Sequence, residues 1–84
     1  MIKGKAIISD HAGIHARPAA NIAILVKNSE SDVVFHINGN EVDPGNYIKL
    51  MSLNAKCGDE VDIIVEGSDE NKVLAELIAI LQNE

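Results

Sequence analysis

An 84-residue chain with a net charge of −6, and with 46% hydrophobic but only 2% aromatic residues, is expected to form one domain, 1–84, around a core of Ile, Leu, Val and Ala. Its acidic balance excludes general nucleic-acid binding, and no apolar run is long enough for insertion into a membrane. The N-terminus lacks a signal-peptide pattern and the single cysteine, Cys57, cannot form an internal disulfide, so the sequence predicts a cytoplasmic protein.

The first half of the chain predicts three strands and one helix, with a hairpin between the second and third strands. Alternating residues predict a first strand at 2–9. After a polar loop, apolar residues at helical spacing predict a helix at 16–27. A second alternating run predicts a strand at 32–37, and Asn38-Gly39 is a strong hairpin signal that leads into a short strand at 40–42.

The second half predicts a helix, a strand and a helix. Residues 46–53 are too irregular for a strand and favour a short helix, with Asn54 as its left-handed cap. A strand is predicted at 60–66, broken by Gly67. Four apolar residues at spacings of three and four then predict a helix at 70–82: Leu74, Leu77, Ile78 and Leu81.

The predicted order is β-α-β-β-α-β-α, which favours an α+β fold. We expect an open-faced two-layer sandwich, in which three helices cover one face of a four-stranded antiparallel sheet. Ile7 and Ile64 are expected on the other face. If the first and fourth strands are neighbours, these two residues would form an exposed apolar patch, too small for an interface.

The segment 13–20, Gly-Ile-His-Ala-Arg-Pro-Ala-Ala, carries the most specific chemistry. Pro18 suits a first helical turn, so a helix that begins at Ala16 has His15 as its N-cap. The free N–H groups of Ala16 and Arg17 and the helix dipole then form an anion site, to which the Arg17 guanidinium adds phosphate-binding donors. A neutral imidazole is a good nucleophile, so these residues predict a reversible phosphohistidine.

The alternative is that His15 only caps the helix and Arg17 is a solvated charge. Histidine is not among the preferred N-cap residues, which are Ser, Thr, Asp and Asn. The residue types therefore favour the phosphohistidine.

The other reactive side chains predict no second site. His11 lies in the polar loop and His36 at an outward strand position, and neither has the clustered spacing of metal ligands. Cys57 has no adjacent base, and the acidic residues near the fourth strand are expected to form a solvated edge. No metal site and no cofactor are expected.

Residues 13–20 resemble the active-centre signature of HPr, the histidine-containing phosphocarrier family of the bacterial phosphoenolpyruvate-dependent sugar phosphotransferase system. The resemblance extends along the chain through three further segments: Asn38-Gly39, Met51-Ser52-Leu53 and 67–71. It implies the same fold, and a carrier rather than an enzyme.

The resemblance also implies that His15 accepts a phosphoryl group on Nδ1 from enzyme I and donates it to an enzyme IIA domain. Arg17 would stabilise that group, and Pro18 would complete the active centre. Partner docking would use apolar and basic residues of the first two helices, namely Ala20, Lys27, Tyr47, Ile48, Lys49 and Met51. For Ile48 and Met51 the alternative is ordinary core packing.

Three residues depart from the family pattern. Asn46 stands where many relatives carry a regulatory serine, so this regulation is expected to be absent. Ala12 replaces a small polar residue that can assist the phosphohistidine, and Tyr47 replaces a common aliphatic residue. These departures suggest a specialised paralogue. A carrier in a non-sugar phosphorelay and a regulatory interaction module are the alternatives, and both His15 and the absence of the serine count against the regulatory module. A monomer is expected.

Overall fold

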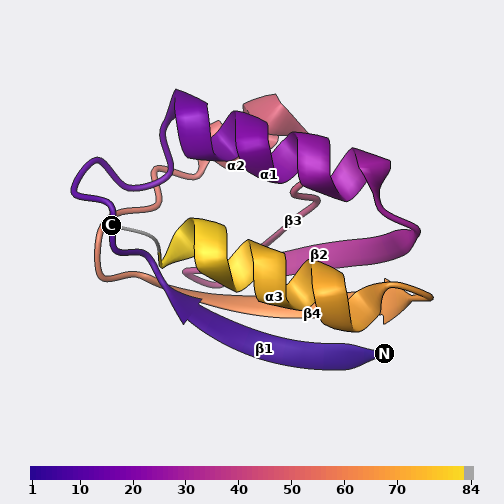
Figure 1. Cartoon of the computed structure of the whole chain (residues 1–84). Helices are drawn as coiled ribbons and strands as arrows, with labels where there is room; N and C mark the ends of the chain where they lie inside the picture. Colours follow the sequence, from indigo (N-terminus) through magenta and orange to yellow (C-terminus); the bar gives the residue numbers. More distant parts are fainter. Residues whose placement is uncertain (83–84) are drawn as a thin grey trace.

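The computed structural model describes residues 1–82. Its elements follow the predicted order: β1 (Ile2–Ile7), α1 (Ala16–Asn28), β2 (Ser31–Ile37), β3 (Asn40–Val42), α2 (Tyr47–Ser52), β4 (Glu60–Gly67) and α3 (Glu70–Leu81). The strands form an antiparallel sheet in the order β1-β4-β2-β3. All three helices cover the same face of this sheet (Figure 1), which confirms the predicted two-layer α+β architecture.

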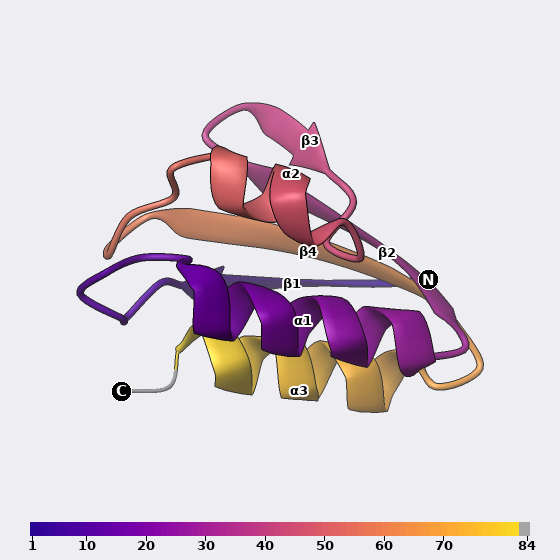
Figure 2. The same ribbon diagram turned by 90° about the horizontal axis from the view of Figure 1, so that it is seen from above.

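The core lies between the sheet and the helices. Phe35 of β2 and Ile63 of β4 are fully buried, as are Ile22 of α1 and Leu77 of α3. Burying one such side chain contributes about 1.5–3 kcal/mol. Seen from above, α1 and α3 run side by side and α2 lies on the other side of α1 (Figure 2), so α1 occupies the middle of the helical layer.

The predicted ends of several elements are wrong by one or two residues. β1 ends at Ile7 rather than Ser9, because Ile8 exchanges backbone hydrogen bonds with the loop that precedes β4. α2 begins at Tyr47 because Asn46 is its N-cap, with Oδ1 accepting a hydrogen bond from the Lys49 N–H at 3.1 Å. At the C-terminal end β4 includes Gly67, and α3 ends at Leu81.

The predicted patch of Ile7 and Ile64 is also wrong. β1 and β4 are neighbours, but in their register Ile7 pairs with Glu60 and Ile64 pairs with Lys3. The two isoleucines are therefore four residue positions apart along the strand pair, at about 3.3 Å per residue. They do not form one apolar surface.

Candidate functional site

The loop between β1 and α1 is anchored on the loop that follows α2. The N–H of Ile14 donates to the carbonyl oxygen of Ala55 at 3.2 Å, and the N–H of Gly13 donates to the carbonyl oxygen of Asp10 at 2.9 Å. Gly13 has φ 73°, a conformation that favours glycine. A Cβ at Gly13 would also overlap the Ala55 carbonyl. These contacts fix where α1 begins.

His15 is the N-cap of α1, as predicted. Its backbone is extended, and its carbonyl oxygen accepts the first helical hydrogen bond from Ala19 at 3.0 Å. Its side chain makes no capping hydrogen bond, and Pro18 has no N–H to offer. The amide N–H groups of Ala16 and Arg17 have no acceptor among residues 1–82. Two amides at the positive end of the helix dipole are therefore available to an anion.

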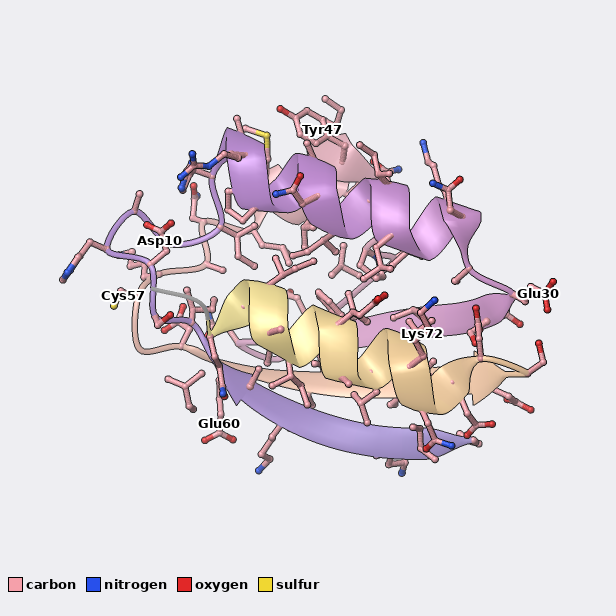
Figure 3. All side chains as sticks on the ribbon, viewed as in Figure 1. Asp10, Glu30, Tyr47, Cys57, Glu60 and Lys72 are labelled. Carbon is pink, nitrogen blue, oxygen red and sulfur yellow. The ribbon has the colours of Figure 1, made fainter. Side chains whose placement is uncertain are left out.

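The His15 ring contacts the loop through one of its two nitrogens. Nε2 lies 3.0 Å from Oδ2 of Asp10, while Oδ1 of Asp10 accepts from the N–H of Ala12 at 2.9 Å. The Ala12 amide, and after it the His15 ring, hold the pKa of Asp10 below its usual value. Nδ1 of His15 has no hydrogen-bond partner in the described part of the chain. Figure 3 shows Asp10 in the loop that leads to the N-terminal end of α1.

Arg17 lies in the first turn of α1 and is exposed. Within residues 1–82 no carboxylate forms an ion pair with its guanidinium. Its charge contributes a small part of the lowering of the Asp10 pKa, which places it in electrostatic reach of the loop. The first turn of α1 therefore carries two amides without an acceptor and a guanidinium without an ion-pair partner among residues 1–82, and both are kinds of group that bind phosphate-sized anions.

The predicted docking residues lie on the helical side of the molecule. The Ile48 side chain is 70% exposed, so it is not part of the core, whereas Tyr47 and Met51 pack partly against the core. Lys27 lines one shallow surface groove with Tyr47 and Ile48, and Met51 lines another with Ala12. Figure 3 shows Tyr47 on the side of the helices away from the sheet.

The remaining predicted docking residues flank this surface. Ala20 of α1 is half-buried, and Lys49 of α2 is exposed. Ile24 was not predicted to be at the surface, yet it is 59% exposed. It is one helical repeat of seven residues from Arg17 and therefore lies on the same side of α1. In the sequence, the residues one helical turn from Ile24 include Asn21, Lys27 and Asn28, and this polar surrounding is the signal that could have identified it.

The other reactive residues lie outside this site. His11 is exposed, and Nε2 of His36 lies 3.6 Å from a carboxylate oxygen of Glu41. The Cys57 thiol lies 3.6 Å from the carbonyl oxygen of Ser9. Residues 1–82 contain no cluster of three side chains that could hold a metal ion, and no helix among them could cross a bilayer.

Sequence reasoning missed three aspartates whose carboxylates accept hydrogen bonds, two of which join segments far apart in the sequence. Besides Asp10, Asp59 accepts hydrogen bonds from the Lys56 N–H and the Asn38 side chain, and Asp69 accepts from the Glu30 N–H and the Ser31 hydroxyl. Asp59 and Asp69 are therefore the exceptions in an acidic edge that was predicted to be mostly solvated. Asp10 could have been found from the turn sequence Asp10-His11-Ala12-Gly13, because an aspartate in a turn often accepts a hydrogen bond from the backbone amide two residues later.

The chain is similar to a known protein family along almost its whole length. A family model described as the phosphorylation site of the phosphotransferase-system HPr component matches residues 2–83. The HPr-like protein Crh of Bacillus subtilis (strain 168) is 34% identical over 84 residues, which cover 100% of this chain and 99% of Crh. The phosphocarrier protein HPr of Mycoplasma genitalium is 36% identical over 83 residues, covering 98% of this chain and 94% of that protein.

Solved structures show the same fold. The crystal structure of the phosphocarrier protein HPr from Bacillus anthracis str. Ames matches with a TM-score of 0.89 and 28% identity, covering 96% of each chain. A crystal structure of Bacillus subtilis Crh, described as a domain-swapped dimer, matches with a TM-score of 0.75 and 34% identity, covering 100% of this chain and 97% of that one. Since the family model and both relatives span nearly the whole chain, this protein belongs to the HPr family of phosphocarrier proteins.

Proposed function

We propose that this protein carries phosphoryl groups in the phosphoenolpyruvate-dependent phosphotransferase system, accepting them on His15 from enzyme I and donating them to an enzyme IIA domain during sugar uptake. The whole chain, 1–84, would act as one cytoplasmic domain and as a monomer. The observation that carries the proposal is the position of His15 at the start of α1, where the N–H groups of Ala16 and Arg17 have no acceptor among residues 1–82.

The chemistry requires only positioning and electrostatic stabilisation. The Nδ1 lone pair attacks the phosphorus, and the phosphoryl oxygens move into the space beside the first turn of α1. There they accept hydrogen bonds from the amides of Ala16 and Arg17 and from the Arg17 guanidinium, as Pro18 keeps the turn helical without competing for them. No metal or cofactor takes part in this transfer.

Partners would dock on the surface formed by α1 and α2. Ile48 and Met51 supply apolar contacts beside Tyr47 and Ala20, and Lys27 and Lys49 supply positive charge at the edge. The whole protein is acidic, so this local positive charge would orient an acidic partner surface.

The test is to incubate the protein with phosphoenolpyruvate and a catalytic amount of enzyme I, and to measure its intact mass. The expected result is an acid-labile gain of one phosphoryl group. His15→Ala should abolish this gain, and His11→Ala should retain it because His11 is an exposed loop residue outside the site. A folded protein that gains no phosphoryl group, or gains it equally with His15→Ala, would contradict the proposal.

A regulatory role is the second candidate, because Crh, which is 34% identical over the whole chain, is described as a catabolite-repression protein. The position expected for a regulatory serine is Asn46, which has no hydroxyl and caps α2 instead. A regulatory module would bind its partners equally well with His15→Ala. A carrier in a specialised non-sugar phosphorelay would instead exchange phosphate with a different enzyme I and enzyme IIA, so exchange assays with purified pairs separate the two systems.

A further inference from the structure

We propose that Asp10 is a positioning residue for the phosphohistidine: it holds the His15 ring with its proton on Nε2, so that Nδ1 presents its lone pair to the phosphoryl group. The part that Asp10 plays in transfer rests on the proposed function of His15. The orientation of the ring does not, because it follows from contacts within the free protein.

The Asp10 carboxylate is held in position by contacts other than the one with the His15 ring. Its Oδ1 accepts from the N–H of Ala12 at 2.9 Å, and its backbone carbonyl accepts from the N–H of Gly13 at 2.9 Å. These two bonds form a tight turn closed by an aspartate side chain. Because Ile14 is in turn bonded to Ala55, the carboxylate is held in one place relative to α1 (Figure 3).

The identity of the partner decides which ring nitrogen carries the proton. An ionised carboxylate only accepts hydrogen bonds, so Nε2 at 3.0 Å from Oδ2 must be the donor. The hydrogen bonds to Asp10 lower its pKa, which keeps the carboxylate ionised at neutral pH. A neutral imidazole has a single N–H, so Nδ1 is left with a free lone pair.

The same contact suits the phosphorylated ring. When Nδ1 attacks an N-phosphorylated imidazole of a donor, the new N–P bond forms as the donor's P–N bond breaks, and the bonding pair returns to the donor nitrogen. The His15 ring keeps its Nε2 proton and gains one positive charge. The negative charge of the Asp10 carboxylate stabilises this positive ring. Donation to the next imidazole reverses these steps, and neither step needs a proton from solvent.

Asp10 has no substitute in the described part of the chain. Ala12 contributes only its backbone N–H to the carboxylate, and no side chain of residues 1–82 other than Asp10 is hydrogen-bonded to the His15 ring. Substitution of Asp10 should therefore change which nitrogen of the His15 ring carries the proton.

The test uses Asp10→Asn and two measurements that need no partner protein. In the variant the amide oxygen can still accept from Ala12, which turns the NH2 group toward Nε2 and favours the proton on Nδ1. Two-bond ¹H–¹⁵N spectra in alkaline buffer should show wild-type His15 protonated on Nε2 and the variant shifted toward Nδ1. Phosphorylation by phosphoramidate, a small chemical donor, should be about tenfold slower in the variant, by analogy with the partners that orient metal-binding histidines.

Asp59→Asn is the matched control, because the Asp59 carboxylate accepts from the Lys56 amide at 2.9 Å in the same manner but does not contact His15. It should leave both measurements unchanged. A wild-type ring protonated on Nδ1 would overturn the proposal without any variant, and so would unchanged spectra and rates in folded Asp10→Asn. If the ring behaves as expected but wild-type protein does not exchange phosphate with enzyme I, the orienting role of Asp10 is supported and the proposed function fails.

Discussion

The backbone of Gly13 helps to determine where α1 begins. It combines a positive φ with close packing against Ala55. Gly58 shares the positive φ, at 93°, but has open space where a Cβ would lie. The two glycines therefore separate the cost of a left-handed backbone from the cost of a steric overlap.

Gly13→Ala is expected to lower the free energy of unfolding by at least about 2 kcal/mol, because the left-handed conformation costs about 1–2 kcal/mol and the overlap with Ala55 adds to it. Gly58→Ala should lose only the conformational part. Urea denaturation of the two variants measures both values. Equal losses would show that the approach to Ala55 does not constrain the loop.

At this scale the sequence points to His15 as the proposed reacting group but not to Asp10, which contacts its ring. His15, Arg17 and Pro18 were identified because their types and spacing carry chemistry at the start of a helix. The contact with Asp10 depends on the conformation of the segment 8–15 between β1 and α1, which the periodicity of apolar residues does not describe. The hydrogen bonds of Asp59 and Asp69 were missed because periodicity does not describe contacts between loops either.

Among the helices, α2 carries the most exposed large apolar side chain, Ile48. It is short, and one side packs on the core through Leu50 while Ile48 projects into solvent. An isoleucine at 70% exposure adds little to folding, which makes it a sensitive probe of docking. Ile7, on the opposite face of the sheet and 45% exposed, is the matched control.

Ile48→Glu should change the free energy of unfolding by no more than about 0.5 kcal/mol, as for other exposed positions. It should slow phosphoryl transfer between enzyme I and an enzyme IIA domain several-fold, because a charge replaces an apolar contact. Ile7→Glu should leave transfer at the wild-type rate. A steady-state transfer assay with limiting carrier measures both, and equal rates for the two variants would exclude α2 from the docking surface.

Periodicity predicted the elements themselves well, because each has one apolar face that must be buried. Their ends were less predictable. Ile8 continues the alternation of β1 and is buried, yet its backbone partners lie in the loop before β4, so the strand ends one residue earlier. The spacing of Ile7 and Ile64 depended on the register between two strands, which alternation alone does not determine.

For the molecule as a whole, the hydrogen-bonded aspartates Asp10, Asp59 and Asp69 link stability to pH. The pKa of Asp69 is lowered chiefly by the Glu30 amide and next by the Ser31 hydroxyl. A lowered folded-state pKa means that this stabilisation is complete above the unfolded value of about 3.9 and is lost as the pH falls through the folded value. The same sign applies to Asp10 and Asp59.

The thermal midpoint of the wild type should therefore fall as the pH is lowered from 5 to about 3 or below, around the ordinary aspartate pKa. Asp69→Asn removes one titrating group and should flatten this fall, while Asp32→Asn, whose side chain makes no hydrogen bond within residues 1–82, should not. Thermal unfolding followed by circular dichroism across this range measures the slopes. Identical slopes for all three proteins would contradict the role given to Asp69.

The measurement that tests the central claim most directly is a ¹H–¹⁵N spectrum recorded before and after phosphorylation by phosphoenolpyruvate and enzyme I. If His15 carries the phosphoryl group at the start of α1, the amide protons of Ala16 and Arg17 should move downfield together with a change at Nδ1 of His15. Phosphorylation that leaves those two amides and the His15 ring unchanged, or that changes the His11 ring instead, would contradict the account.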